Sequence, residues 1–202
     1  KKGMSDRMVP IEWEAERFHN VIDLPEEYEV RDLTTGVYQP SESEYDIGKY
    51  DENRPGVYNT DLFQGTRTLH VGLDIGAPIN SPCMSFDQGE IAYFGYNPSE
   101  GDYGHVVVTK HELQGKPLWA LYGHLSSRSI LGKRKGQKID RGEIVGWIGG
   151  KEENGGWEPH LHFQLSWSDP MTHDMPGVVD PKDRSDALAR YPDPRIVLGP
   201  IY

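Results

Sequence analysis

Two histidines stand one residue apart in residues 159–165, which read PHLHFQL. Side chains alternate between the two faces of a β-strand, so His160, His162 and Gln164 would share one face. The three apolar residues of the run would share the other face and reach the core. Two imidazoles side by side on one strand face most often bind a metal or carry out proton chemistry.

A second stretch with the same alternation is residues 70–76, which read HVGLDIG. It would place His70 and Asp74 on one face, with Gly72 leaving space between them. Imidazole nitrogens and carboxylate oxygens are ordinary zinc ligands, and three protein ligands with one open position are typical of catalytic zinc sites. Either motif alone more often occurs in an ordinary strand that binds no metal. Together, His70, Asp74 and His162 indicate a three-ligand metal site.

A further histidine, His124, lies in residues 119–126 (WALYGHLS), beside a glycine at the expected end of a strand. Alone it would be an unremarkable strand histidine. Hydrolysis by a metal-activated water needs a base for the proton and a hydrogen-bond donor for the oxyanion. His124 and His160 are the residues that we predict for these roles.

The elements that position these residues are predominantly strands. Short apolar-alternating segments separated by Gly, Pro and Asn predict strands at 68–75, 88–94, 105–111, 117–124, 142–148 and 160–167. Residues 66–202 therefore read as a mainly all-β, antiparallel domain, with one helical turn at 185–190. Residues 1–65 read as an irregular N-terminal arm that packs on it, with a short strand at 28–33. Within the arm, 10–23 suit either a short amphipathic helix or an extended segment.

Composition narrows the class of protein. The 202 residues carry a net charge of −11, which argues against nucleic acid as a partner. The basic residues at 133–141 read as a solvated hairpin. The single Cys83 cannot form an internal disulfide, no apolar stretch suits a transmembrane segment, and no signal peptide is visible. The oligomeric state stays open.

In this order, HxxxD, YGHLS and PHLHFQL resemble the M23 (lysostaphin- and LytM-like) zinc metallopeptidases. The similarity extends to the segments 76–78, 89–91, 102–108 and 135–146, and it covers about residues 66–182. The resemblance implies the antiparallel fold of that family and one Zn²⁺ held by His70, Asp74 and His162. It also implies that His124 and His160 are the catalytic histidines.

The function that the resemblance implies is a zinc endopeptidase that cleaves Gly- or D-Ala-containing cross-bridge or stem peptides of peptidoglycan. Its location would be periplasmic or extracellular, with a cytoplasmic location left open. Two other functions fit the same motifs. One is a binding or regulatory module that holds zinc without catalysis, and the other is a hydrolase of a small peptide-like amide.

The loop before the HLH motif departs from the family pattern, which has small residues ending in Thr-Gly-Pro. Residues 153–159 read ENGGWEP instead. This ENGGW-x-PHLHFQ motif resembles a subgroup that also occurs fused to aminotransferase and kinase-like domains. Trp157, Asn154 and His105 are the predicted substrate contacts, although a packing role suits Trp157 equally well.

Overall fold

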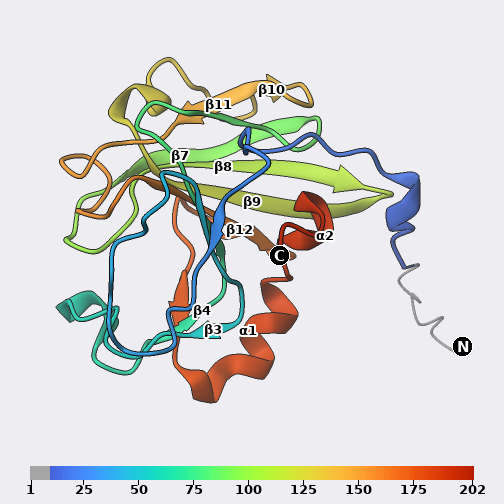
Figure 1. The fold of residues 1–202 in the computed structure, drawn as a ribbon. Helices are drawn as coiled ribbons and strands as arrows, with labels where there is room; N and C mark the ends of the chain where they lie inside the picture. Colours follow the sequence, from blue (N-terminus) through green and yellow to red (C-terminus); the bar gives the residue numbers. More distant parts are fainter. Residues whose placement is uncertain (1–9) are drawn as a thin grey trace, which may run out of the picture.

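The structure is a computed structural model that describes residues 10–202 (Figure 1). Its main element is an eight-stranded sheet. The first nine residues of the predicted arm lie outside the described residues. Neighbouring strands run antiparallel except for the first pair, β1 and β2. In spatial order the strands are β1 (Glu29–Val30), β2 (Asp46–Gly48), β5 (Leu73–Gly76), β12 (His160–Ser166), β9 (Lys116–Leu125), β8 (Gly104–Leu113), β7 (Gly89–Asn97) and β10 (Lys138–Ile139).

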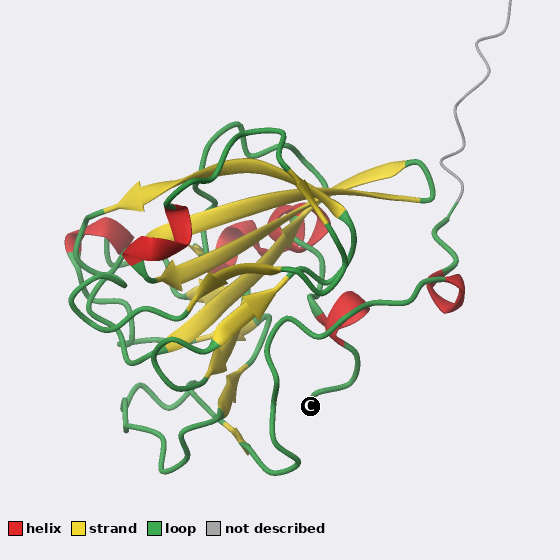
Figure 2. Ribbon diagram, turned by 90° about the horizontal axis from the view of Figure 1, so that it is seen from above, coloured by secondary structure: helices red, strands yellow, loops and turns green. Residues whose placement is uncertain are grey.

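Two smaller sheets and short helices complete the described chain, and Figure 2 shows the helices set around the strands. The prediction of a mainly antiparallel β fold is confirmed. One small sheet holds β13 (Val178–Val179), β4 (Leu69–His70) and β3 (Glu52–Asn53), and the other pairs β11 (Ile144–Trp147) with β6 (Pro82–Met84). The helices are α1 (Arg184–Arg190), α2 (Arg195–Leu198) and the 3-10 turns η1 (Trp13–Ala15), η2 (Asp61–Phe63), η3 (Ser127–Ile130) and η4 (Pro181–Asp183).

Apolar side chains fill both faces of the large sheet. On β8, Val107 belongs to one buried cluster, whereas Val106 and Val108 belong to the other. The same period of two holds on β12, where Leu161 and Phe163 lie in the first cluster. The predicted alternation of the PHLHFQL run is therefore confirmed, and its polar face is free for the site.

The predicted continuous strand at 68–75 is wrong, because the chain changes sheets within it. β4 pairs with β3 and β13, whereas β5 joins the large sheet between β2 and β12. The change occurs around Gly72, where a Cβ atom would lie 2.4 Å from the ring of His162. His70 and Asp74 thus reach the same place from two sheets rather than from one strand face.

The N-terminal segment matches the extended alternative more than the helical one, since only η1 is helical before β1. Its backbone is hydrogen-bonded to residues 84–86: the amide of His19 donates to Phe86 O at 2.9 Å, and the amide of Met84 donates to Val21 O at 2.8 Å. Farther along, β1 and β2 extend the large sheet and β3 pairs with β4. Among residues 10–202, no helix combines the length and the apolar character that crossing a bilayer requires.

Candidate metal centre

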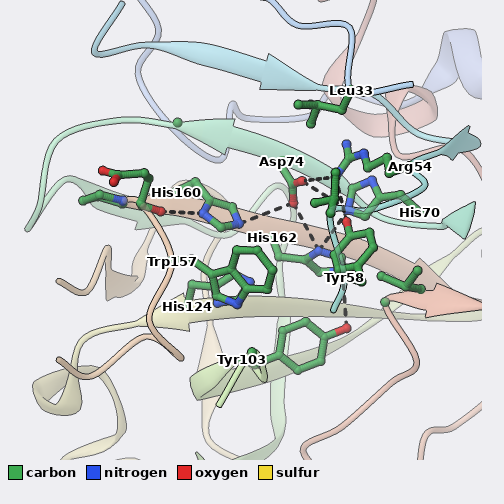
Figure 3. Close-up of a pocket in the computed structure, with 18 of the residues that line it drawn as sticks. Leu33, Arg54, Tyr58, His70, Asp74, Tyr103, His124, Trp157, His160 and His162 are labelled. Atoms are coloured by element: carbon green, nitrogen blue, oxygen red, sulfur yellow. Dashed lines mark hydrogen bonds and ion pairs between the residues drawn. The ribbon is translucent and has the colours of Figure 1, made fainter. Parts of the chain in front are cut away.

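Strand register brings the predicted residues together. His162 on β12 stands opposite Asp74 of β5 on one side and Gly123 of β9 on the other. A cavity of about 770 Å³ opens over this part of the sheet (Figure 3). Its lining includes all five residues predicted for metal binding and catalysis, His70, Asp74, His124, His160 and His162, together with Trp157.

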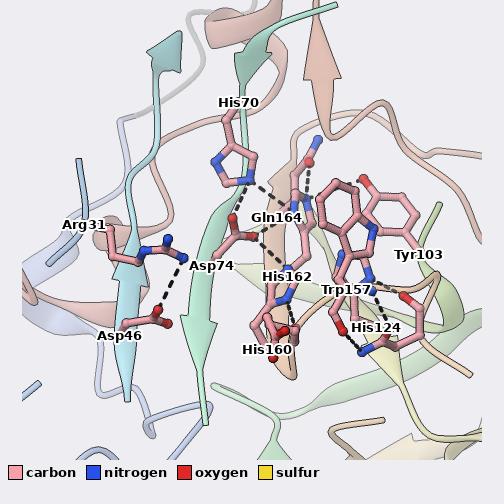
Figure 4. A network of polar contacts seen from close by, with 12 residues as sticks. Arg31, Asp46, His70, Asp74, Tyr103, His124, Trp157, His160, His162 and Gln164 are labelled. Atoms are coloured by element: carbon pink, nitrogen blue, oxygen red, sulfur yellow. Dashed lines mark hydrogen bonds and ion pairs between the residues drawn. The ribbon is translucent and has the colours of Figure 1, made fainter. Parts of the chain in front are cut away.

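Three of these side chains converge on one point. His70 Nε2 lies 3.2 Å from Asp74 Oδ2 and 3.3 Å from His162 Nδ1. His162 Nδ1 lies 3.2 Å from Asp74 Oδ1 (Figure 4). Within the described chain, these three residues form a group whose donor atoms are close enough to share one metal ion.

The outer nitrogens of the two imidazoles fix their tautomers. His70 Nδ1 lies 2.9 Å from the carbonyl oxygen of Lys49, which can only accept, so Nδ1 carries the proton. His162 Nε2 lies 2.8 Å from Oε1 of Gln164, and the Gln164 amide is oriented by donating its Nε2 to Pro176 O. In the neutral imidazoles, the unprotonated nitrogens of His70 and His162 therefore face each other.

This arrangement fits a zinc ion. Ligand atoms at the corners of a tetrahedron with bonds of about 2.0–2.2 Å are separated by about 3.3–3.6 Å, close to the three distances found here. Burial lowers the pKa of His70 to about 4, so the imidazole is neutral, as a ligand must be. Burial would raise the pKa of Asp74, but His70, His162 and Arg54 hold it well below its usual range. Two facing lone pairs and a carboxylate attract a cation into the space between them.

His124 and His160 lie next to this group, with ring centroids 4.4 Å apart. Each donates Nδ1–H to a backbone carbonyl at 2.7 Å, His124 to Asn154 and His160 to Glu158. In the neutral imidazoles this leaves both Nε2 atoms without a proton, and His160 Nε2 lies 3.7 Å from Asp74 Oδ1. Burial, with the neighbouring imidazoles, lowers the pKa of His124 well below its ordinary value.

The ENGGW loop is tied down by one side chain. Asn154 is fully buried, and its Nδ2 donates to Gly149 O at 3.1 Å and to Trp157 O at 2.9 Å. Its Oδ1 accepts from the amides of Gly156 at 3.0 Å and Trp157 at 2.9 Å. The turn also needs Gly155, whose φ is +96° and whose Cβ would meet Asp102 O at 1.9 Å.

The three predicted substrate contacts take different places. Trp157 lines the cavity, with its ring 6.3 Å from that of His124 and 5.9 Å from that of Tyr58. Asn154 and His105 do not line it. His105 instead donates Nδ1–H to Glu153 O at 3.0 Å, and its ring stacks on that of Tyr96. Asn154 and His105 therefore hold the ENGGW loop in place without lining the cavity.

Sequence reasoning missed several residues that surround the group. Gln164 had a signal, because it shares the strand face of the two histidines. Tyr103, whose hydroxyl lies 3.4 Å from His162 Nε2, and Arg54, which donates to Asp74 Oδ2 at 2.9 Å, had none. Arg54 and Tyr58 come from a segment without a recognisable motif, and only the fold places them in the cavity lining.

The profile of peptidase family M23 matches residues 68–174, just over half of the chain. The chain belongs to peptidase family M23. The matched range contains all three histidine motifs and the residues of the group described above, whereas Arg54 and Tyr58 precede it.

Curated relatives share the family domain. Over 119 residues, 58% of this chain, the sequence is 35% identical to cell division protein DipM of Caulobacter vibrioides, and it covers 18% of that protein. Over 96 residues, 48% of this chain, it is 33% identical to peptidoglycan DD-endopeptidase ShyA of Vibrio cholerae, and it covers 20% of that protein. The chain thus spans about a fifth of the length of these relatives.

Among solved structures, the chain is similar to the catalytic domain of the antimicrobial peptidase lysostaphin from Staphylococcus simulans. The TM-score is 0.49 at 24% sequence identity, and the match covers 70% of this chain and 92% of that one.

Proposed function

We propose that this M23 protein is a zinc-dependent endopeptidase that hydrolyses peptide bonds in the cross-bridge or stem peptides of peptidoglycan. One observation carries the proposal: His124 and His160 present unprotonated Nε2 atoms beside a group of two imidazoles and a carboxylate. Metal binding needs only the two imidazoles and the carboxylate. Proton transfer at a neighbouring peptide bond needs His124 and His160.

The metal would be held by His70, Asp74 and His162, whose donor atoms have suitable separations. Bound Zn²⁺ supplies a Lewis acid that polarises a peptide carbonyl and makes water acidic near neutral pH. The unprotonated Nε2 of His124 or His160 accepts the proton of the attacking water. The imidazole that then carries the proton donates it to the amine nitrogen as the C–N bond breaks, while the Nδ1–H bonds hold both rings in place.

The substrate class is supported by the names of the relatives. ShyA is a peptidoglycan DD-endopeptidase, and another relative, from Neisseria meningitidis, is named DD-carboxypeptidase/endopeptidase Mpg. Gly- and D-Ala-containing peptides are accordingly the first substrates to test. We propose a periplasmic or extracellular place of action on the same ground.

A module that only holds zinc does not need His124 and His160. In this chain the ENGGW loop fixes His124 through Asn154 O, and Glu158 O fixes His160. Such arranged Nε2 atoms favour catalysis over binding alone. Hydrolysis of a small peptide-like amide uses the same chemistry, and substrate screening separates it from peptidoglycan cleavage.

The deciding experiment incubates purified, zinc-loaded protein with peptidoglycan sacculi, with short Gly- and D-Ala-containing peptides and with small amides, and identifies products by mass spectrometry. We expect chelator-sensitive cleavage of a peptidoglycan peptide that zinc restores. His160→Ala is the matched variant, because it should bind zinc without cleaving. Absence of cleavage across the panel by zinc-loaded protein would overturn the peptidase proposal, and undiminished activity in both His124→Ala and His160→Ala would overturn the proposed proton transfer.

A further inference from the structure

A fully buried guanidinium lies behind the candidate metal site. Arg54, which directly follows β3, is 2% exposed, and a buried cation is costly unless every donor finds an acceptor. Its Nε donates to Glu52 Oε1 at 2.8 Å, and its NH1 donates to Asp74 Oδ2 and to the hydroxyl oxygen of Tyr58, both at 2.9 Å. Its NH2 donates to Lys49 O at 3.2 Å. Figure 3 shows Arg54 beside Asp74 and His70.

The Arg54 contact constrains the one proposed ligand that is not a histidine. Asp74 Oδ2 receives the Arg54 hydrogen bond and lies 3.2 Å from His70 Nε2, while Oδ1 lies 3.2 Å from His162 Nδ1. A carboxylate held at one oxygen by a fixed donor cannot rotate freely away from the two imidazoles. We propose that Arg54 is a positioning residue that sets the carboxylate of Asp74 for metal binding. The inference rests on the proposed zinc site.

A cation this close to a metal would weaken binding if nothing offset it. Glu52 supplies that offset, because its carboxylate is buried and pairs with Arg54 Nε at 2.8 Å. The Glu52–Arg54–Asp74 set therefore carries one net negative charge. A lysine would keep the positive charge, but its single ammonium lacks the planar fork that reaches Glu52 and Asp74 together.

The same segment also holds a second proposed ligand. The carbonyl of Lys49, which accepts from Arg54 NH2, accepts His70 Nδ1–H at 2.9 Å. Strand pairing sets this up, since Gly48 of β2 stands opposite Asp74, and Glu52 of β3 stands opposite His70.

Gly48 must be small at this point, because a Cβ there would lie 2.8 Å from Arg54 NH2 and 3.1 Å from Asp74 Oδ2. Residues 46–54, which precede the family-matched range, thus complete the metal site from behind.

The test compares zinc affinity and the visible spectrum of the Co²⁺-substituted protein in full-length Arg54→Met and Arg54→Lys variants. Removing a partner of a metal ligand typically lowers affinity about 10–100-fold, and we expect a loss in this range for both variants. We also expect an altered Co²⁺ ligand-field spectrum, because the carboxylate changes its orientation. Circular dichroism checks folding, and Arg54→Lys, which keeps charge and most of the volume, serves where Arg54→Met does not fold.

The matched control is Arg184→Met. Arg184 pairs with Asp51 of the same segment at 2.6 and 2.9 Å, but it lies at the surface. We expect this variant to keep the zinc affinity and the cobalt spectrum of the unmodified protein. If the unmodified protein binds zinc and folded Arg54→Lys matches it in both measurements, the positioning role is overturned while the proposed function stands. If the unmodified protein itself binds no zinc, both fall.

Discussion

His124 donates its Nδ1–H to the backbone carbonyl of Asn154 across 2.7 Å, and the side chain of the same Asn154 orients Trp157 on the cavity wall. One buried residue therefore holds both a proposed catalytic imidazole and the backbone of the tryptophan beside it. His124 itself has a φ of +63°, a left-handed conformation that is uncommon outside glycine. The loop and the strand end constrain each other.

Truncating this anchor should cost stability and activity together. Asn154→Ala removes four hydrogen bonds of a fully buried amide, and at about 1 kcal/mol each we expect a loss of about 2–4 kcal/mol in the free energy of unfolding. Urea unfolding measures it. Asn97→Ala is the control, since the side chain of Asn97 donates one hydrogen bond, to His173 O at 2.9 Å. An equal, small effect of both substitutions would contradict the anchoring role.

The two histidines of the HLH motif should separate in function. His162→Ala removes a proposed ligand and should abolish tight zinc binding. His160→Ala should retain the metal while turnover falls by about 10²–10⁴-fold, the usual contribution of a general acid or base. Zinc content by mass spectrometry and peptide cleavage rates measure the two effects. Loss of zinc from His160→Ala would contradict this division.

A single methyl group at Gly72 should disrupt the site. The Cβ of Gly72→Ala would lie 2.4 Å from His162 Cε1 and Nε2, so the imidazole must leave its present position. We expect zinc affinity to fall by at least about tenfold, because the displaced His162 imidazole no longer has the position that metal binding needs. Gly95→Ala is a matched control, because its Cβ would meet the ring of His173 at 2.7 Å, away from the site. Equal zinc affinities of the two variants in a chelator competition would argue against the role of Gly72.

Acid should destabilise the fold through His111, which lies far from the proposed ligands in sequence. Burial lowers the pKa of His111 to about 4, although the carbonyl of Gln88 accepts its Nδ1–H. Between pH 6.5 and about 4 the unfolded chain binds a proton that the folded chain does not, so stability falls as the pH falls through this window. The shift corresponds to up to about 3 kcal/mol.

The measurement is urea unfolding at pH values from 7 to 4. We expect His111→Asn, which keeps a donor for Gln88 O, to show a shallower fall in stability than the unmodified protein. An unchanged slope in His111→Asn would show that other groups cause the acid sensitivity.

The sequence predicted the structure of β12 most fully. The period of two in PHLHFQL predicted that Leu161 and Phe163 enter the core and that the polar face gathers two histidines, because alternation is a local property of a strand. The order of the three motifs likewise indicated the family to which the chain belongs. Residues 10–23 left two conformations open, because Trp13 and Val21 blur the helical stripe. In the fold, backbone hydrogen bonds from His19 to Phe86 and from Met84 to Val21 hold the extended one.

The sequence by itself determined the identities of His70, Asp74, His124, His160 and His162 and the strand character that presents the last of them. Tertiary structure decided the rest. Where the chain changes sheets, Gly72 leaves room for the ring of His162, which lies 90 residues farther along the chain. The contact between Arg54 and Asp74 depends on the pairing of β2 with β5. Such long-range contacts leave no periodic trace in the sequence, because they form only when distant strands pair.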